Sequence, residues 1–305
     1  MTPENSIRQG WDKARRHVGW LRTEGIAKIV EEDNLRPINR TREALTKWRW
    51  RRAHGVEPGT ARPVYLVGVQ RSGTNMLTRG LERAPSFEVH NENDRRAFRN
   101  FRLDVAAAER LVASSRHAFV LFKPLCDSHL TTQLLDHSAT AGQSGAALWV
   151  YRDPDARARS ALAKFGDANL QAMRSIADGS GLDSWQALGL TATQLDYVRS
   201  LDWSVTTPYE AALIFWALRN EIYFSLGLDR RPDTILTRYE DLLADPVAAF
   251  APICNLLELE FDPQYVEHIE VRHAPADPAP VAPHVRDLVD AMLDRLQSAS
   301  TDLQP

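Results

Sequence analysis

The stretch Val67-Gly-Val-Gln-Arg-Ser-Gly-Thr-Asn-Met-Leu77 decides the fold of this chain. The apolar run Val64 to Val69 is short and rich in β-branched residues, which predicts a buried strand rather than a helix. A turn over residues 70–73 follows, and a helix is expected to begin near Thr74. A strand that runs through a glycine-containing turn into a helix is typical of anion sites, because the turn amides and the helix start point to the same place.

Other short apolar runs predict further strands of the same sheet. They lie at Phe119 to Phe122, at Ala147 to Tyr151 and at Thr234 to Thr237, and another strand is expected around Glu88. Helical stretches separate these runs, including one at Pro208 to Leu226. Strands that alternate with helices predict an α/β fold with a central parallel sheet.

The sequence indicates three parts along the chain. Apolar residues at helical spacing between Ile7 and Leu21 and a basic stretch from Thr41 to Ala53 predict a helical N-terminal extension over residues 1–60, which is also a candidate homodimer interface. The α/β core is expected over residues 61–275. Residues 276–305 form a proline-rich segment and a C-terminal helix that we expect to pack on the core.

The cysteine content and the apolar runs bear on the cellular location of the protein. Only two cysteines occur, Cys126 and Cys254, which favours reduced thiols and a cytoplasmic location over a disulfide framework. The longest apolar run, Ala211 to Leu218, is too short to cross a bilayer, and no secretory signal is visible. We therefore expect a cytoplasmic protein without a membrane span.

The charge is unevenly distributed. The net charge is −3, but residues 1–60 hold 13 basic and 8 acidic side chains. Attraction of the whole protein to nucleic acid is therefore not indicated. Residues 36–52 combine seven basic residues and one acidic residue with Trp48 and Trp50. This stretch is either a solvated helix face with core tryptophans or a surface for anionic lipid or nucleic acid.

The turn after the first strand differs from the loop of P-loop kinases and NTPases. Gly68 and Gly73 have the required spacing, but Thr74 stands where the lysine belongs and Asn75 stands where the magnesium-binding hydroxyl belongs. A metal-dependent kinase or NTPase is thus disfavoured. A tight turn that needs glycine for backbone reasons alone is the other interpretation.

The same residues resemble the first phosphosulfate-binding loop of the sulfotransferases that use 3′-phosphoadenosine 5′-phosphosulfate (PAPS). That loop reads approximately Pro-Arg/Lys-Ser-Gly-Thr-Thr/Ser, and Gln70-Arg71-Ser72-Gly73-Thr74-Asn75 is similar at four of six positions. Gln70 and Asn75 depart from the pattern, although an asparagine amide can still donate to a phosphate oxygen. The resemblance implies a P-loop-like sulfotransferase fold and PAPS as co-substrate, with no metal. PAPS would be bound by Arg71, Ser72, Gly73, Thr74, Asn75 and Met76.

Two later motifs are similar to the same family, in the family's order. The strand ending at Tyr151 leads into Arg152-Asp153-Pro154, and Ser160 follows Arg152 by eight positions, as in the family's 3′-phosphate motif. A guanidinium and a hydroxyl suit a terminal phosphate. The segment Leu236-Thr-Arg-Tyr-Glu-Asp-Leu-Leu-Ala-Asp-Pro246 resembles a third motif, which implies that Tyr239 contacts the nucleotide.

The family's two branches differ in their catalytic base. The branch acting on phenols and steroids has a histidine shortly after a lysine, but here Lys123-Pro124-Leu125 keeps the lysine and has leucine instead. Carbohydrate-type members use a glutamate after the second strand, so the resemblance implies Glu92 as base, with His90 and Asp94 as secondary candidates. Arg71 would neutralise the leaving phosphate, and Lys123 would orient the sulfuryl group.

The expected activity is sulfuryl transfer from PAPS to a hydroxyl of a small acceptor: a sugar, a glycosylated natural product or a lipid. A non-catalytic nucleotide-binding protein on the same fold stays open as an alternative, since fold does not fix function. No nucleic-acid partner is expected. The segments that would wall the acceptor pocket, between Asp94 and His117 and between Gly166 and Thr207, match no pattern that identifies the acceptor.

Overall fold

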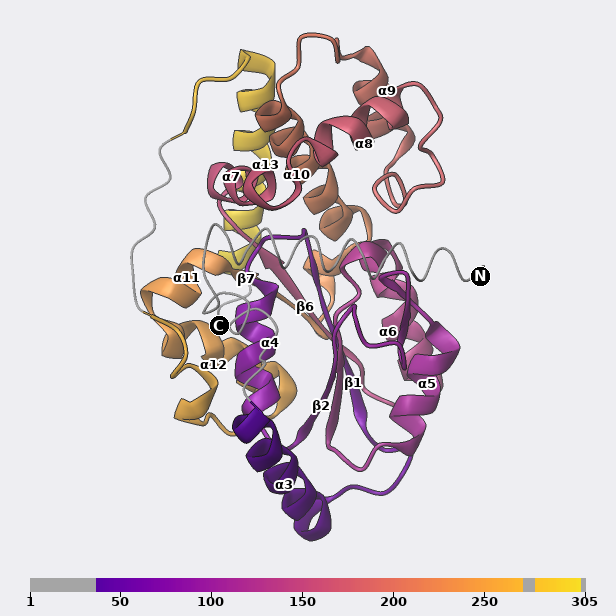
Figure 1. Cartoon of the computed structure of the whole chain (residues 1–305), viewed down its shortest axis with the longest axis vertical. Coiled ribbons are helices and arrows are strands. Elements are labelled where there is room, and N and C mark those ends of the chain that lie inside the picture. The colour runs from indigo at the N-terminus through magenta and orange to yellow at the C-terminus, as the bar shows by residue number, and fades with distance from the viewer. Residues whose placement is uncertain (1–36, 271–277, 303–305) are drawn as a thin grey trace. The chain divides into compact units, whose positions relative to one another are not determined.

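A computed structural model describes residues 37–270 and 278–302 of the chain (Figure 1). The helix expected between Ile7 and Leu21 lies outside the described residues. The chain divides into two compact units, residues 1–52 and residues 53–305. Helix α3 (Pro37–His54) is the described part of the first unit and ends just inside the second. The part boundaries expected at residues 60 and 275 stay predictions.

The second unit is built on a five-stranded parallel sheet in the order β2-β5-β1-β6-β7. The strands are β1 (Arg62–Gly68), β2 (Phe87–His90), β5 (Phe119–Phe122), β6 (Ala146–Tyr151) and β7 (Thr234–Arg238). The predicted central parallel sheet is thus confirmed. A separate two-stranded hairpin, β3 (Phe98–Arg99) with β4 (Arg102–Leu103), was not expected from the sequence.

Helices surround this sheet (Figure 1). They are α4 (Thr74–Arg83), α5 (Val105–Ser114), α6 (Thr131–Thr140), α7 (Pro154–Phe165), α8 (Ala168–Ala177), α9 (Ala192–Ser200), α10 (Pro208–Ser225), α11 (Tyr239–Ala244), α12 (Pro246–Leu257) and α13 (Pro283–Asp302). Short 3₁₀ helices are η1 (Leu125–Leu130), η2 (Leu228–Arg230) and η3 (Pro263–Tyr265).

The inner strands β1, β5 and β6 bury both faces, because successive side chains point to opposite sides of the sheet. Tyr65 and Val67 of β1 join one apolar core with α6, α8, α10 and α13. Val64 and Leu66 join a second core with α4, α11 and α12. This double coverage explains why the strands read as continuous apolar runs in the sequence.

The direction of the chain changes at β1. From β1 the chain moves to β2 and returns through β5, whereas β6 and β7 lie on the other side of β1. In open parallel sheets of this kind, ligands bind at the carboxyl ends of the strands near such a switch point. The fold therefore directs attention to the segments that follow β1, β5 and β6.

Candidate active site

The sequence-predicted site residues all follow the carboxyl ends of parallel strands. The loop with Arg71 follows β1, Glu92 follows β2, Lys123 follows β5, Arg152 follows β6 and Tyr239 follows β7. Because parallel strands present their carboxyl ends at one edge, residues spread over most of the chain meet there.

The loop after β1 has an unusual backbone. Arg71 has a φ of 73° and Gly73 a φ of 92°, so two residues of four adopt the left-handed region. The N–H of Ser72 donates to Val69 O (3.2 Å), which closes the turn. Gly73 then serves as the N-cap of α4, and the N–H groups of the first helical turn are the kind that binds anions.

Gly73 also lets the ring of Tyr239 approach the loop. A β-carbon at Gly73 would collide with the Tyr239 ring. Tyr239 is buried at the start of α11, and Arg152 lies over its ring at 4.5 Å from the guanidinium carbon to the ring centre. The first and third sequence motifs are thus in contact.

Arginine side chains link the loop to the second motif. The Nε of Arg71 donates to Ser160 Oγ (3.0 Å), and Arg152 Nη1 donates to the carbonyl oxygen of Arg71 (3.3 Å). Asp153 caps α7 by accepting from Ala156 N (2.7 Å), as the Asp-Pro pair indicates. Burial, partly offset by neighbouring carboxylates and Tyr239, lowers the pKa of Arg152.

Two polar atoms of this cluster are buried without a hydrogen-bond partner among the described residues. They are Ser72 Oγ and Arg152 Nε. Buried polar groups normally have partners, so an unsatisfied pair suggests that a ligand completes it. A hydroxyl and a guanidinium N–H are both donors for phosphate oxygens.

Sequence reasoning missed Arg157, which supports the loop from behind. This side chain is fully buried on α7 and donates from Nε to Gln70 O (3.0 Å) and from Nη1 to Ala212 O (3.0 Å). Burial, and then the nearby charge of Arg71, lower its pKa to about 9. A buried arginine next to a second arginine favours a bound anion nearby. Its sequence signal was only that it is one of two arginines in α7, which is also typical of a solvated helix face.

Lys123 and Glu92 form the other half of the site. Lys123 Nζ lies 3.0 Å from Glu92 Oε2 and donates to Asn75 Oδ1 (2.6 Å). The lysine side chain is 6% exposed and that of Glu92 17%, so neither is the solvated surface group that a lone charge usually is. Asn75 joins this pair to the loop after β1. Leu125, at the place of the absent histidine, is buried.

The secondary candidates His90 and Asp94 form a separate cluster. His90 is fully buried, its ring stacks on Phe122, and its Nδ1 lies 2.8 Å from Asp94 Oδ2. Its Nε2 is 3.3 Å from Glu88 Oε1, an ion-pair contact without hydrogen-bond alignment. The cluster fixes the turn on which Glu92 stands, since Asp94 N donates to Asn91 O (2.8 Å).

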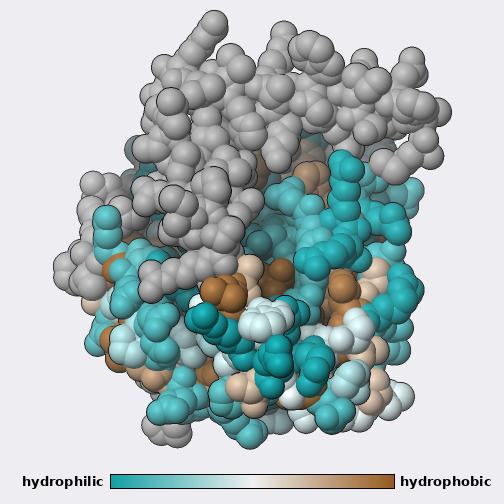
Figure 2. Space-filling view, turned by 60° about the horizontal axis from the view of Figure 1, so that its bottom comes forward, coloured by the Kyte–Doolittle hydropathy of each residue, from teal (hydrophilic) through white to brown (hydrophobic). Residues whose placement is uncertain are grey.

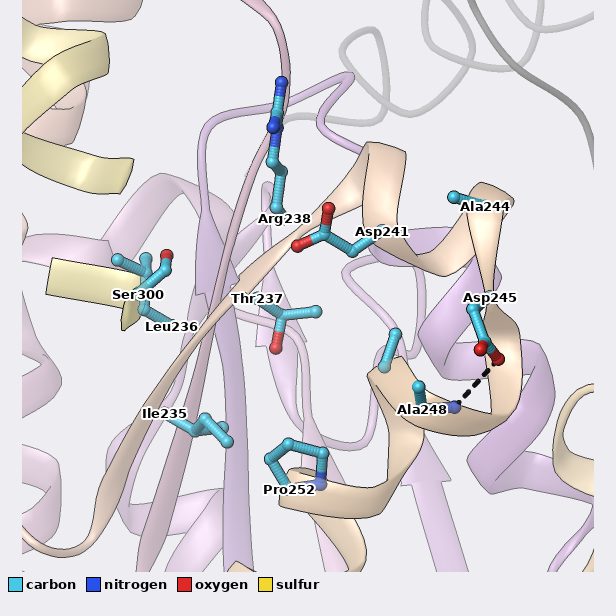
Figure 3. A pocket seen from close by; sticks show the side chains of 11 residues that line it. Ile235, Leu236, Thr237, Arg238, Asp241, Ala244, Asp245, Ala248, Pro252 and Ser300 are labelled. Carbon is cyan, nitrogen blue, oxygen red and sulfur yellow. Dashed lines mark hydrogen bonds between the residues drawn. The ribbon is translucent and has the colours of Figure 1, made fainter. Parts of the chain in front are cut away.

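A cavity of about 300 Å³ lies beside the edge strand β7 (Figure 3). Its lining comes from β7, α11, α12 and Ser300, and it includes Arg238 and Asp241. Burial raises the pKa of Asp241. None of the sequence-predicted site residues lines this cavity.

Within residues 37–270 and 278–302, no group of three metal-ligating side chains was found. The same part of the chain holds no helix long and apolar enough to span a membrane.

Comparison with known proteins was informative only at the level of structure. No protein family model matches the chain, and no curated protein matches it. The chain is similar to solved sulfotransferases, at low identity and modest superposition. A sulfotransferase from Alicyclobacillus acidocaldarius has 17% identity and a TM-score of 0.43, and the match covers 80% of this chain and 96% of that one.

Two further structures give similar values. The sulfotransferase domain from the curacin biosynthetic pathway has 12% identity and a TM-score of 0.44, covering 76% of this chain and 98% of the domain. Mouse sulfotransferase SULT7A1, complexed with PAP, has 13% identity and a TM-score of 0.37. The match covers 80% of this chain and 68% of that one. Each is described as a sulfotransferase, the family that the three sequence motifs resemble.

Proposed function

We propose that this chain is a PAPS-dependent sulfotransferase that moves the sulfuryl group to a hydroxyl of a small acceptor. The observation that carries the proposal is the contact between the three motifs. Arg71 is 81 residues from Arg152, 89 from Ser160 and 168 from Tyr239 in sequence, yet hydrogen bonds and a ring contact join these residues at one edge of the sheet.

The residues present fit a nucleotide with two separate phosphate groups. Ser72 Oγ and the start of α4 would hold the 5′-phosphosulfate, while Arg152 and Ser160 would hold the 3′-phosphate. Unsatisfied donors on Ser72 and Arg152 support this assignment. Tyr239, packed against Gly73, would border the adenine.

PAPS supplies an activated sulfuryl group on a good leaving phosphate. Glu92 accepts the proton of the acceptor hydroxyl while the acceptor oxygen bonds to sulfur. The bond from sulfur to the bridging phosphate oxygen breaks, and its electron pair stays on that oxygen. Arg71 and Lys123 stabilise this negative charge, and Arg71 does so without giving up a proton. The products are a sulfate ester, adenosine 3′,5′-bisphosphate and a proton on Glu92.

Asn75 distinguishes the loop from that of a kinase or NTPase. It accepts from Lys123 through its amide oxygen and carries no hydroxyl for magnesium. A non-catalytic nucleotide-binding protein would need neither Glu92 nor Lys123 beside the loop. Their ion pair, largely withdrawn from solvent, favours the enzyme.

The test is thermal unfolding with nucleotides. We expect adenosine 3′,5′-bisphosphate to raise the midpoint by roughly 5 °C at 100 times its Kd without added metal. ATP with magnesium should do less. The shift should shrink in Arg152→Ala, but not in Arg199→Ala, whose partner is the exposed Asp196. If ATP with magnesium stabilises the protein and the bisphosphate does not, the sulfotransferase proposal is wrong.

A further inference from the structure

The hairpin β3-β4 has an unsuitable residue at its tip. Arg99 pairs with Arg102, so the two-residue loop consists of Asn100 and Phe101. Both loop residues have positive φ, 51° and 64°. Two-residue hairpin loops of this type require φ above zero at both positions and prefer asparagine followed by glycine. Asn100 suits its position, whereas Phe101 stands where glycine is preferred.

A phenylalanine in this conformation is strained, because its β-carbon crowds the backbone. Burial of the ring does not compensate for the strain, since Phe101 is 52% exposed. Among the described non-glycine residues with positive φ, it is the only hydrophobic one. Strained residues that persist are concentrated at functional sites.

The surrounding structure holds the tip firmly. The buried carboxylate of Asp127 accepts from Leu103 N (2.7 Å) and pairs with Arg102. Arg99 Nε donates to Asp104 Oδ2 (3.0 Å) on the other side of the loop. The backbone on both sides of Phe101 is therefore anchored.

The hairpin stands beside the candidate active site. Its first strand follows directly on the turn with Glu92, since Phe98 N donates to Asp94 O (2.9 Å). Its anchor Asp127 is next to Cys126, whose sulfur lies 3.7 Å from Gln70 Nε2 at the phosphate loop. Burial raises the pKa of Cys126 to about 12, and the charges of both Glu92 and Arg102 act on the same thiol.

Exposed hydrophobic side chains are otherwise scattered. On the face seen in Figure 2, hydrophobic residues form small separate groups among hydrophilic ones. Single exposed hydrophobic residues are normal and need no ligand. Phe101 differs because a residue without a side chain would fit its backbone better.

We infer that Phe101 contacts the acceptor, and that the acceptor carries an apolar group close to the hydroxyl that receives the sulfuryl group. This inference rests on the proposed function. It favours a lipid or a glycosylated natural product over a free sugar, because a free sugar offers little apolar surface to a phenyl ring.

The experiment compares Phe101→Gly with Asn100→Gly. Both changes relieve positive-φ strain in the same turn, so both should keep or raise the unfolding midpoint. The acceptors are n-hexyl β-D-glucoside and methyl β-D-glucoside, which share their hydroxyls and differ in the alkyl chain. We expect Phe101→Gly to lower kcat/KM for the hexyl compound about tenfold, the factor that corresponds to 1.4 kcal/mol. The methyl compound should be unaffected, and Asn100→Gly should behave like wild type.

Binding measurements separate this inference from the proposed function. Affinity for adenosine 3′,5′-bisphosphate tests the nucleotide site and should be equal in all three proteins. Binding of each glucoside, measured by titration calorimetry with the bisphosphate present, tests Phe101 even if turnover is absent. The inference is overturned if wild type shows no preference for the hexyl compound, or if Phe101→Gly keeps that preference. It is also overturned if Phe101→Gly alone destabilises the fold, since the ring would then have a structural role.

Discussion

Glu92 depends on two other residues for its position. Lys123 binds its carboxylate, and Asn75 holds the same lysine from the phosphate loop. In the proposed mechanism, Glu92 is the proton acceptor beside the sulfuryl group, and these two contacts hold its carboxylate in place. A general base must be within hydrogen-bond reach of the proton that it removes, and this arrangement supports that geometry.

Replacing Glu92 by glutamine should therefore abolish most of the turnover and leave nucleotide binding intact. Glutamine keeps the shape of the side chain but cannot accept the proton. We expect kcat to fall by ~10²–10⁴-fold, while the affinity for adenosine 3′,5′-bisphosphate changes little. Steady-state sulfation together with calorimetric titration of the bisphosphate measures both quantities.

Glu267→Gln is the matched control, because Glu267 is 62% exposed and pairs only at the surface with Arg83. That variant should keep its activity. Retention of more than about a tenth of wild-type turnover by Glu92→Gln would remove the glutamate from the mechanism. His90 and then Asp94 would be the next variants, since they lie on the same turn.

At this scale, the sequence predicted which residues would meet at the strand ends but not what they contact. Arg71, Arg152 and Tyr239 follow strand ends in recognisable motifs, so their grouping was predictable. The burial of Lys123 was not, because a lysine at a strand end is usually a surface amine. Arg157 was missed, since only packing against Ala212 on α10 shows that it points inward.

A glycine ends strand β1 where it pairs with β6. Gly68 pairs with Val150, has a φ of 125°, and a β-carbon there would collide with the Val150 carbonyl oxygen. The same strand end leads into the loop that holds Arg71. Gly68 thus contributes both to the sheet and to the path of the loop.

Gly68→Ala should lower the free energy of unfolding through two effects. The positive φ costs roughly 1–2 kcal/mol for a residue with a β-carbon. The collision with a backbone oxygen adds about 1–3 kcal/mol, as overpacking does. Urea denaturation measures the sum.

Gly142→Ala isolates the first effect, because Gly142 has a φ of 77° and nothing within 4 Å of an added β-carbon. Gly142→Ala should lose only the free energy of unfolding that the positive φ costs. Equal losses in the two variants would show that β6 moves away from β1 at little cost. The close approach at Gly68 would then have no structural importance.

Elements with a clear periodic pattern were predictable. Phe119–Phe122 has the bounds expected from the sequence, and the helix expected at Pro208 to Leu226 is α10. The hairpin β3-β4 was not found, because each of its strands has two residues and its turn lacks the glycine that usually marks such a loop. Its second strand is anchored by Asp127, a contact that no local pattern encodes.

The order of the strands is a property of the whole molecule. Alternating strands and helices predicted a parallel sheet, but the order β2-β5-β1-β6-β7 depends on contacts between distant segments. Some charged side chains also depend on contacts between separate segments. The carboxylate of Glu88 on β2 accepts a hydrogen bond from Ser115 Oγ, which follows α5.

The carboxylates of Glu88 and Asp94 make the folding stability depend on pH in the acid range. Burial alone would raise the pKa of Glu88, but interactions with His90 and Ser115 lower it to about 2, from an ordinary value of 4.5. Burial would likewise raise the pKa of Asp94, but hydrogen bonds with Arg96 and His90 lower it to about 2, from 3.8. The charge interaction with His117 also lowers the pKa of Glu88.

The direction of the pH dependence of stability follows from these lowered pKa values. A carboxylate with a lower pKa in the folded state binds fewer protons there than in the unfolded chain, so it stabilises the fold at pH values above its ordinary pKa. This stabilisation is lost as the pH falls from about 4.5 toward 2. Burial raises the pKa of Glu240 and Asp241 instead, so these two groups act in the opposite direction.

Glu88→Gln and Asp94→Asn should therefore unfold with a weaker dependence on pH between 4.5 and 2 than wild type does. Each removes one group that must take up a proton on unfolding, so the difference in unfolding free energy from wild type should be largest near neutral pH. We expect roughly 1.5–3 kcal/mol there, the usual contribution of hydrogen bonds to charged groups. Urea denaturation at a series of pH values gives the slopes, and Glu267→Gln should leave them nearly unchanged because exposed ion pairs contribute little. If Glu88→Gln and Asp94→Asn keep the wild-type slope, the carboxylates around His90 do not sustain the acid dependence, and the turn with Glu92 is held by its backbone alone.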